Sequence, residues 1–201
     1  TQQFGVIPAE IYEPIALGAT IADPEEAAPV YTQANNAIRE LVPMVPIAHG
    51  GSAVAYRADV VNPQASPLTS EMFAFTDPGG RDVFVWMQNA EPISMFCADE
   101  TDGESLRACE QVMQSLYGYE INGTAVEPVL AESCTPNEDL TVWTCTLRQD
   151  VKFHDGSTFD AYDVVATFNM GLNIASPFHV GNTNLWEYYD YLWGLMKKPG
   201  E

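Results

Sequence analysis

The sequence predicts a mixed α/β fold in which helices and short strands share a packed interior. Three observations carry this prediction. Helix start signals recur along the chain, apolar runs of strand length lie between them, and 46% of the 201 residues are hydrophobic. That much apolar material is ample for a core, which argues against a disordered or fibrous chain.

The charge balance narrows the range of partners. The chain has 28 Asp and Glu residues against 8 Lys and Arg, which gives a formal net charge of -20. Binding of nucleic acid by a basic face needs clustered Lys and Arg, so we expect no nucleic-acid partner. Adsorption to an anionic membrane surface is disfavoured for the same reason. No apolar run reaches 18 residues, and the first ten residues lack the order of a signal peptide.

A helix is expected after Asp23, which has the sequence of an N-cap. Pro24 suits the first helical position, and Glu26 is placed to complete a capping box. Apolar residues follow at helical spacing, and Pro43 should end the helix. The apolar run 44–48 contains a proline and therefore predicts a short edge strand.

A turn-rich cluster at 76–82 divides the chain, which predicts a first block at 1–76, a junction at 77–81 and a second block at 82–201. In the second block, the run 82–87 predicts a strand covered on both faces, and a helix is expected from Glu104. The pattern then predicts a hairpin with arms 126–134 and 141–147. Asp160, with Asp163 three residues later, predicts the start of another helix.

The four cysteines form two locally spaced pairs and no C-x-x-C motif, which disfavours a zinc ribbon or a thioredoxin-type site. We expect one disulfide between Cys97 and Cys109, and one between Cys134 and Cys145 across the hairpin. Four reduced, buried cysteines remain the alternative. If the bridges form, the protein matures outside the cytosol.

The segment 185–196 would be a helix that is apolar on all sides. One stripe carries Trp186, Tyr189 and Trp193, and these three residues are the candidate partner interface. Two interpretations stay open. The helix is buried within its own domain, or a partner or missing domain covers half of it.

Little in the sequence indicates catalysis or a cofactor. The three histidines are scattered, no G-x-S-x-G elbow is present, and no Gly-rich phosphate loop occurs, so we expect no enzyme, no metal and no cofactor. The acidic stretch 99–104 does not fit the EF-hand register and is either solvated or ligand-facing. Asn122-Gly123-Thr124 matches a glycosylation sequon, and it also makes a good turn.

The run 151–165, VKFHDGSTFDAYDVV, resembles the signature of the peptide/nickel type of solute-binding protein that serves ABC importers. Three further motifs follow that family's order: EPIS at 91–94, LAES at 130–133 and TLR at 146–148. The resemblance implies one lobe of a periplasmic-binding-protein-like fold of type II, the peptide-binding class, with a disulfide-bridged hairpin. The first block resembles the stretch near that family's C-terminus, so the order is reversed and the family's opposing lobe is absent from these 201 residues. Because the two ends of the family's chain meet in one lobe, the resemblance implies that both blocks pack as one domain.

The resemblance also implies a role. We expect a non-catalytic receptor outside the cytosol, in the periplasm or at the cell surface, that captures a peptide or similar small solute and delivers it to the membrane subunits of an ABC importer. The ligand-lining loop falls near 101–105, which makes Asp102, Gly103 and Glu104 the candidate ligand contacts, whereas His154 and Asp155 should hold a turn. The alternative is a structural subunit of an extracellular polymer or complex, with a second lobe or copies of itself as the partner.

Overall fold

Helices, short strands and long loops make up the computed structural model, which describes residues 6–51, 53–68, 71–180 and 186–196. The described chain divides into two compact units. One unit comprises residues 1–52 with 133–146, and the other comprises residues 53–132 with 147–201. This division lies at residue 52, and the turn at 77–81 lies inside the second unit. The boundary between the two units differs from the predicted junction, so the division into blocks 1–76 and 82–201 stays a prediction.

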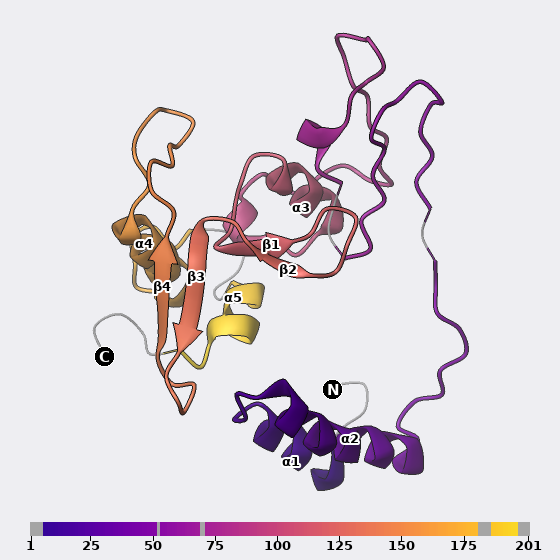
Figure 1. The fold of residues 1–201 in the computed structure, drawn as a ribbon, viewed down its shortest axis with the longest axis vertical. Helices are drawn as coiled ribbons and strands as arrows, with labels where there is room; N and C mark the ends of the chain where they lie inside the picture. Colours follow the sequence, from indigo (N-terminus) through magenta and orange to yellow (C-terminus); the bar gives the residue numbers. More distant parts are fainter. Residues whose placement is uncertain (1–5, 52, 69–70, 181–185, 197–201) are drawn as a thin grey trace. The chain divides into compact units, whose positions relative to one another are not determined.

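The first unit contains a helical hairpin. Helix α1 (Ala9–Gly18) packs on α2 (Pro24–Leu41), as Figure 1 shows in indigo and violet. The Asp23 carboxylate caps α2 by accepting hydrogen bonds from the Glu25 and Glu26 amides, as predicted. Helix α2 ends at Leu41, and Val42 adopts a left-handed conformation just before Pro43. Ala27 and Ala34 are buried, so small residues mediate the helix contact.

The predicted edge strand at 44–48 is wrong. These residues are a loop, and Val45 and Ile47 are 73% and 94% exposed. A strand needs a neighbouring backbone that pairs with its N–H groups, and Pro46 also removes one donor.

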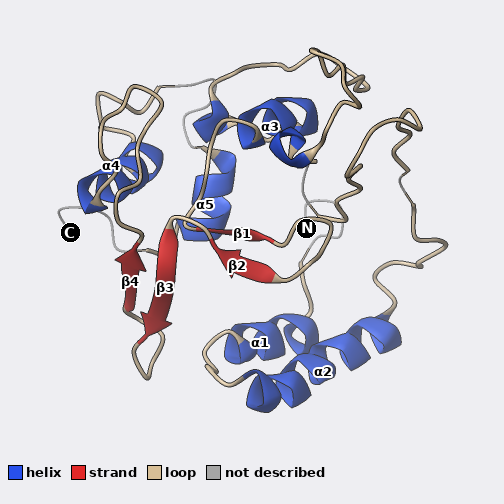
Figure 2. Cartoon of the chain, turned by 45° about the horizontal axis from the view of Figure 1, so that its top comes forward, coloured by secondary structure: helices blue, strands red, loops and turns tan. Residues whose placement is uncertain are grey.

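Two small sheets contain the strands of the described residues. Strands β1 (Tyr117–Tyr119) and β2 (Val126–Pro128) form an antiparallel hairpin with Gly118 opposite Glu127. Strands β3 (Ala131–Pro136) and β4 (Trp143–Leu147) form the second, drawn in red in Figure 2. The predicted hairpin is therefore present as β3 and β4. Its first arm begins at Ala131 and not at residue 126, because Val126–Pro128 pairs with β1.

The predicted strand at 82–87 is also wrong. The segment forms no regular strand and joins neither of the sheets of the described residues. Its side chains alternate: Val83, Val85 and Met87 are 66–91% exposed, whereas Phe84 and Trp86 pack on Phe73 with ring centres 5.2 and 5.0 Å away. One face of the segment is covered and the other is open, so the prediction of two covered faces fails.

The remaining helices belong to the second unit. Helix α3 (Gly103–Glu110) follows the short 3-10 helix η2 (Cys97–Asp99). Helix α4 (Ala161–Leu172) begins at the predicted N-cap Asp160, whose carboxylate accepts from the Tyr162 amide, and Asp163 forms a capping box with it by accepting from the Asp160 amide. Helix α5 (Glu187–Trp193) is shorter than the predicted segment 185–196. Residue 185 and residues beyond 196 lie outside the described part of the chain.

Both predicted disulfide pairings are present. Cys97 bridges Cys109 with Cα atoms 5.6 Å apart, which ties η2 to α3, and Cys134 bridges Cys145 across β3 and β4. The fold is thus a mixture of helices and strands with a disulfide-bridged hairpin.

Candidate functional site

The turn at 77–81 folds back on the segment before it. Val61 and Asp77 exchange backbone hydrogen bonds of 2.9 and 3.0 Å, and the Arg81 guanidinium pairs with the Asp59 carboxylate at 2.5 Å. Gly79 has a φ of +72°, and a Cβ there would overlap the Asp59 carbonyl, so only glycine fits. The residues on either side of the turn therefore lie next to each other.

An aromatic cluster joins the same two stretches. Tyr56 and Phe73, from before the turn, pack on Trp86, from after it, with ring centres 5.7 and 5.0 Å away. Arg107 of α3 lies 5.2 Å from the centre of the Trp86 ring, which is cation–π distance. This cluster brings Tyr56, Phe73 and Trp86 together against the last turn of α3.

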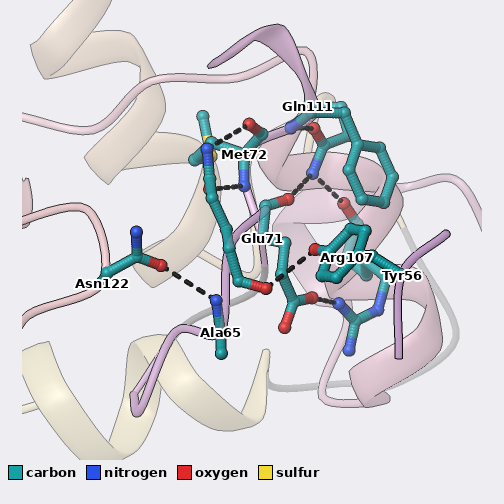
Figure 3. A network of polar contacts seen from close by, with 9 residues as sticks. Tyr56, Ala65, Glu71, Met72, Arg107, Gln111 and Asn122 are labelled. Carbon is teal, nitrogen blue, oxygen red and sulfur yellow. Dashed lines mark hydrogen bonds and ion pairs between the residues drawn. The ribbon is translucent and has the colours of Figure 1, made fainter. Parts of the chain in front are cut away.

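A polar network attaches the same segment to α3 (Figure 3). The buried Glu71 carboxylate forms an ion pair with Arg107, and Gln111 donates to the Glu71 carbonyl and accepts from the Phe73 amide, each at 2.8 Å. Gln64 uses both ends of its buried amide on the Met72 backbone. Because a buried charge needs a partner, loss of either Glu71 or Arg107 would leave its mate unpaired.

The first turn of α3 holds the three candidate ligand residues. Asp102 is the N-cap: its carboxylate accepts from the Ser105 amide at 2.9 Å and from the Ser105 hydroxyl at 2.8 Å. These hydrogen bonds hold the pKa of Asp102 below its usual range, so the group stays ionised. At Gly103 a Cβ would meet nothing within 4 Å, and Glu104 is half-buried. The three residues are consecutive in the chain, and open space lies at Gly103.

Ser105 fixes the position of that turn. Its side chain is fully buried, and its hydroxyl oxygen also accepts from the Ile93 amide at 2.9 Å. The Cys97–Cys109 disulfide holds the other side of the loop. Residues 99–104 are thus held on both sides. Asp99 and Glu100 are buried, whereas the sequence predicted a solvated or ligand-facing stretch.

The turn at 151–159 is built around Asp155. Its carboxylate accepts from the hydroxyl and the amide of Ser157 at 2.7 and 2.9 Å, and these bonds lower the pKa of Asp155. Gly156 has a φ of +88°. The geometry agrees with the structural role expected of Asp155, and His154 is exposed on the same turn.

Of the three candidate interface residues, Trp186 is buried inside the second unit, Tyr189 is half-buried and Trp193 is 42% exposed. Trp186 is 1% exposed and packs on Phe96 and His179, and its ring centre is 5.5 Å from that of Tyr189. Tyr189 and Trp193 both contact Phe168 of α4. The opposite stripe of α5 is the exposed one: Tyr191 and Leu192 are 73% and 69% exposed. A partner on this helix would therefore contact that stripe, and Trp186 is unavailable to it.

A groove of about 550 Å³ lies between α1 and α2, in the other unit. Its lining residues include Glu10, Glu13 and Glu40, and none of the predicted site residues. Among the described residues, no group of three or more His, Cys, Asp or Glu side chains is placed to hold a metal ion. In the same part of the chain, no helix is long and apolar enough to cross a membrane.

Comparison with known proteins identifies the region from β2 to the start of α5. Residues 125–186 match the family described as bacterial extracellular solute-binding proteins, family 5 middle. By sequence, this region resembles the peptide/nickel type of extracellular solute-binding protein. It contains the disulfide-bridged hairpin, the turn at 151–159 and α4, and it ends at the buried Trp186.

The curated relatives are of the same type. The glutathione-binding protein GsiB of Salmonella paratyphi A is 34% identical over 107 residues, which cover 53% of this chain and 20% of the relative. The nickel-binding periplasmic protein of Escherichia coli is 33% identical over 90 residues, 44% of this chain and 16% of the relative. The dipeptide-binding protein of Escherichia coli is 35% identical over 81 residues, 37% of this chain and 15% of the relative.

The chain therefore spans about a fifth or less of the length of these relatives. The family match does not include Asp102, Gly103 or Glu104. No solved structure matches the chain significantly. The assignment of the site at α3 therefore depends on the geometry of this chain and not on the family match.

Proposed function

We propose that this chain forms part of one lobe of a receptor outside the cytosol, which captures a peptide or similar small solute without bond chemistry and delivers it to the membrane subunits of an ABC importer. The match of residues 125–186 to the solute-binding family is the observation that carries this proposal. The relatives named for glutathione, dipeptides and nickel make small solutes the ligand class to test. Two disulfides are in keeping with a protein that works outside the cytosol.

The proposed lobe is built from two stretches that the turn at 77–81 joins. The Tyr56–Trp86 and Phe73–Trp86 ring contacts and the Glu71–Arg107 pair support packing of the two stretches as one domain. A second lobe would come from a further length of the same polypeptide or from another chain. Exposed apolar residues such as Val85 and Met87 support completion by another body.

In this proposal, the first turn of α3 faces the solute. Asp102 positions the loop, because Ser105 already occupies one of its carboxylate oxygens. Glu104, beside the open space at Gly103, pairs with the ammonium group of a peptide. Closure of a second lobe over the site would exclude water and strengthen that pair.

Calorimetric titration of the native particle tests the function. We expect one class among dipeptides, tripeptides, glutathione and Ni²⁺ to bind. For a peptide ligand, Glu104→Gln should weaken binding about tenfold, the effect of losing one charge-assisted hydrogen bond. N-acetylated peptide should not distinguish the two proteins. Glu127→Gln, on the exposed strand β2, is the matched control and should bind like the parent.

The two parts of the proposal fail separately. If no solute in the panel binds the native particle, the receptor function is wrong. If peptides bind but Glu104→Gln leaves their affinity unchanged, the receptor function stands and the site assignment is wrong.

The alternative function is a structural subunit of an extracellular assembly. The exposed stripe of α5, with Tyr191 and Leu192, favours it because an apolar helix face of this kind is usually covered. This function predicts a particle that contains many copies of the chain and binds no solute.

A further inference from the structure

The turn between β1 and β2 carries a motif that solute capture does not use. Asn122, Gly123 and Thr124 form the acceptor pattern for N-linked glycans, and Asn122 and Thr124 are both exposed. The Glu120 amide donates to the Ala125 carbonyl, and the Gly123 amide donates to the Glu120 carbonyl, at 2.8 and 3.0 Å. The pattern therefore sits at the tip of a well-formed hairpin.

Asn122 is held in a defined orientation. Its φ is +60°, and its side-chain oxygen accepts a hydrogen bond from the Ala65 amide at 2.9 Å. Figure 3 shows the side-chain nitrogen turned away from Ala65. The hydrogen bond uses the oxygen alone, so a substituent on the nitrogen would leave that bond intact.

We propose that Asn122 is a site of N-glycosylation. The Asn122 side-chain nitrogen would bond to the anomeric carbon of a lipid-linked glycan, and the bond from that carbon to the lipid phosphate would break. The amide would lose one proton, and the lipid phosphate would leave with the bonding electron pair. This chemistry takes place outside the cytosol, where disulfides such as the two in this chain are also stable.

A glycan on Asn122 is compatible with the fold. The hairpin tip is exposed, so a glycan attached there projects into solvent and displaces no packed side chain. The contact between Asn122 and Ala65 joins the hairpin to the segment 53–68, and the amide oxygen that makes it remains a carbonyl after glycosylation. Neither the proposed solute site nor the aromatic cluster includes this turn.

Intact-mass measurement and peptide mapping of the protein from its native host test the proposal. We expect a discrete mass above that of the polypeptide, which maps to the peptide containing Asn122. Thr124→Val removes the hydroxyl that the transferase reads and keeps Asn122, so it should abolish the added mass. Thr124→Ser keeps the hydroxyl and should retain it. Both variants should match the parent in thermal melting, because the Asn122–Ala65 hydrogen bond is preserved.

Two results would overturn the proposal. The native protein has the polypeptide mass alone, or the added mass persists in Thr124→Val. Asn122→Gln is a second test. It replaces the acceptor itself, so it should also remove the added mass.

Discussion

At the scale of single residues, Gly171 sets how closely α4 and α5 approach. A Cβ at this position would overlap the Tyr189 ring. Gly171→Ala should therefore push α5 outward and reduce the free energy of unfolding by about 1–3 kcal/mol, despite the better helix propensity of Ala. Urea denaturation measures the change. Gly103→Ala is the control, because a Cβ there meets nothing within 4 Å, and it should not destabilise the protein. Equal stability of the two variants would show that α4 and α5 leave room for a methyl group at residue 171.

Asp102 makes the free energy of unfolding depend on pH in the acid range. Its pKa in the folded protein lies below the ordinary value because the Ser105 amide and hydroxyl stabilise the carboxylate. The resulting stabilisation is complete above the unfolded-state pKa and is lost as the pH falls through the folded pKa, which means below about pH 4. Asp102→Asn should therefore lose less stability than the parent between pH 5 and pH 3. Urea midpoints measured across that range check the prediction, and parallel curves for the two proteins would contradict it.

At the scale of elements, the two stripes of α5 should respond differently to a charge. Trp186→Asp would bury a carboxylate against Phe96 and Tyr189, so it should unfold or strongly destabilise the second unit. Tyr191→Asp and Leu192→Asp lie on the exposed stripe and should leave the melting temperature of the isolated chain nearly unchanged. If a partner covers that stripe, the same two variants should reduce assembly in sedimentation experiments. Assembly equal to that of the parent would exclude this face as an interface.

The elements also show what the sequence could and could not predict. The starts of α2 and α4 were predictable because Asp23 and Asp160 cap amides within three residues of themselves. The segments 44–48 and 82–87 have strand-like composition, but pairing depends on a neighbouring backbone that local sequence does not reveal. The strand Tyr117–Tyr119 was missed because three residues are too short to show alternation.

In the candidate site, too, local features were predictable from the sequence and long-range contacts were not. Asp102, Gly103 and Glu104 are consecutive, so their proximity follows from the sequence, and their role as ligand contacts stays a prediction. The role of Asp102 as the cap of α3 came from its contacts with Ser105. The pairing of Glu71 with Arg107 joins residues 36 positions apart, and an acidic and a basic residue at that separation give no signal in one sequence.

At the scale of the whole molecule, the proposed single lobe would offer only one face of a solute site. Affinity in a two-lobed receptor comes from closure around the ligand, which removes both faces from water. Residues 1–201 alone should therefore bind peptides weakly or not at all, whereas the native particle should bind them. Calorimetry of the isolated chain checks this directly, and micromolar binding to it would show that the site needs no second lobe.

The mass and stoichiometry of the native particle distinguish a two-lobed receptor from a polymer. We predict a particle of finite mass in which one copy of these residues is completed by one opposing lobe. A polymer of many copies, with no opposing lobe, would contradict the receptor and favour the structural subunit.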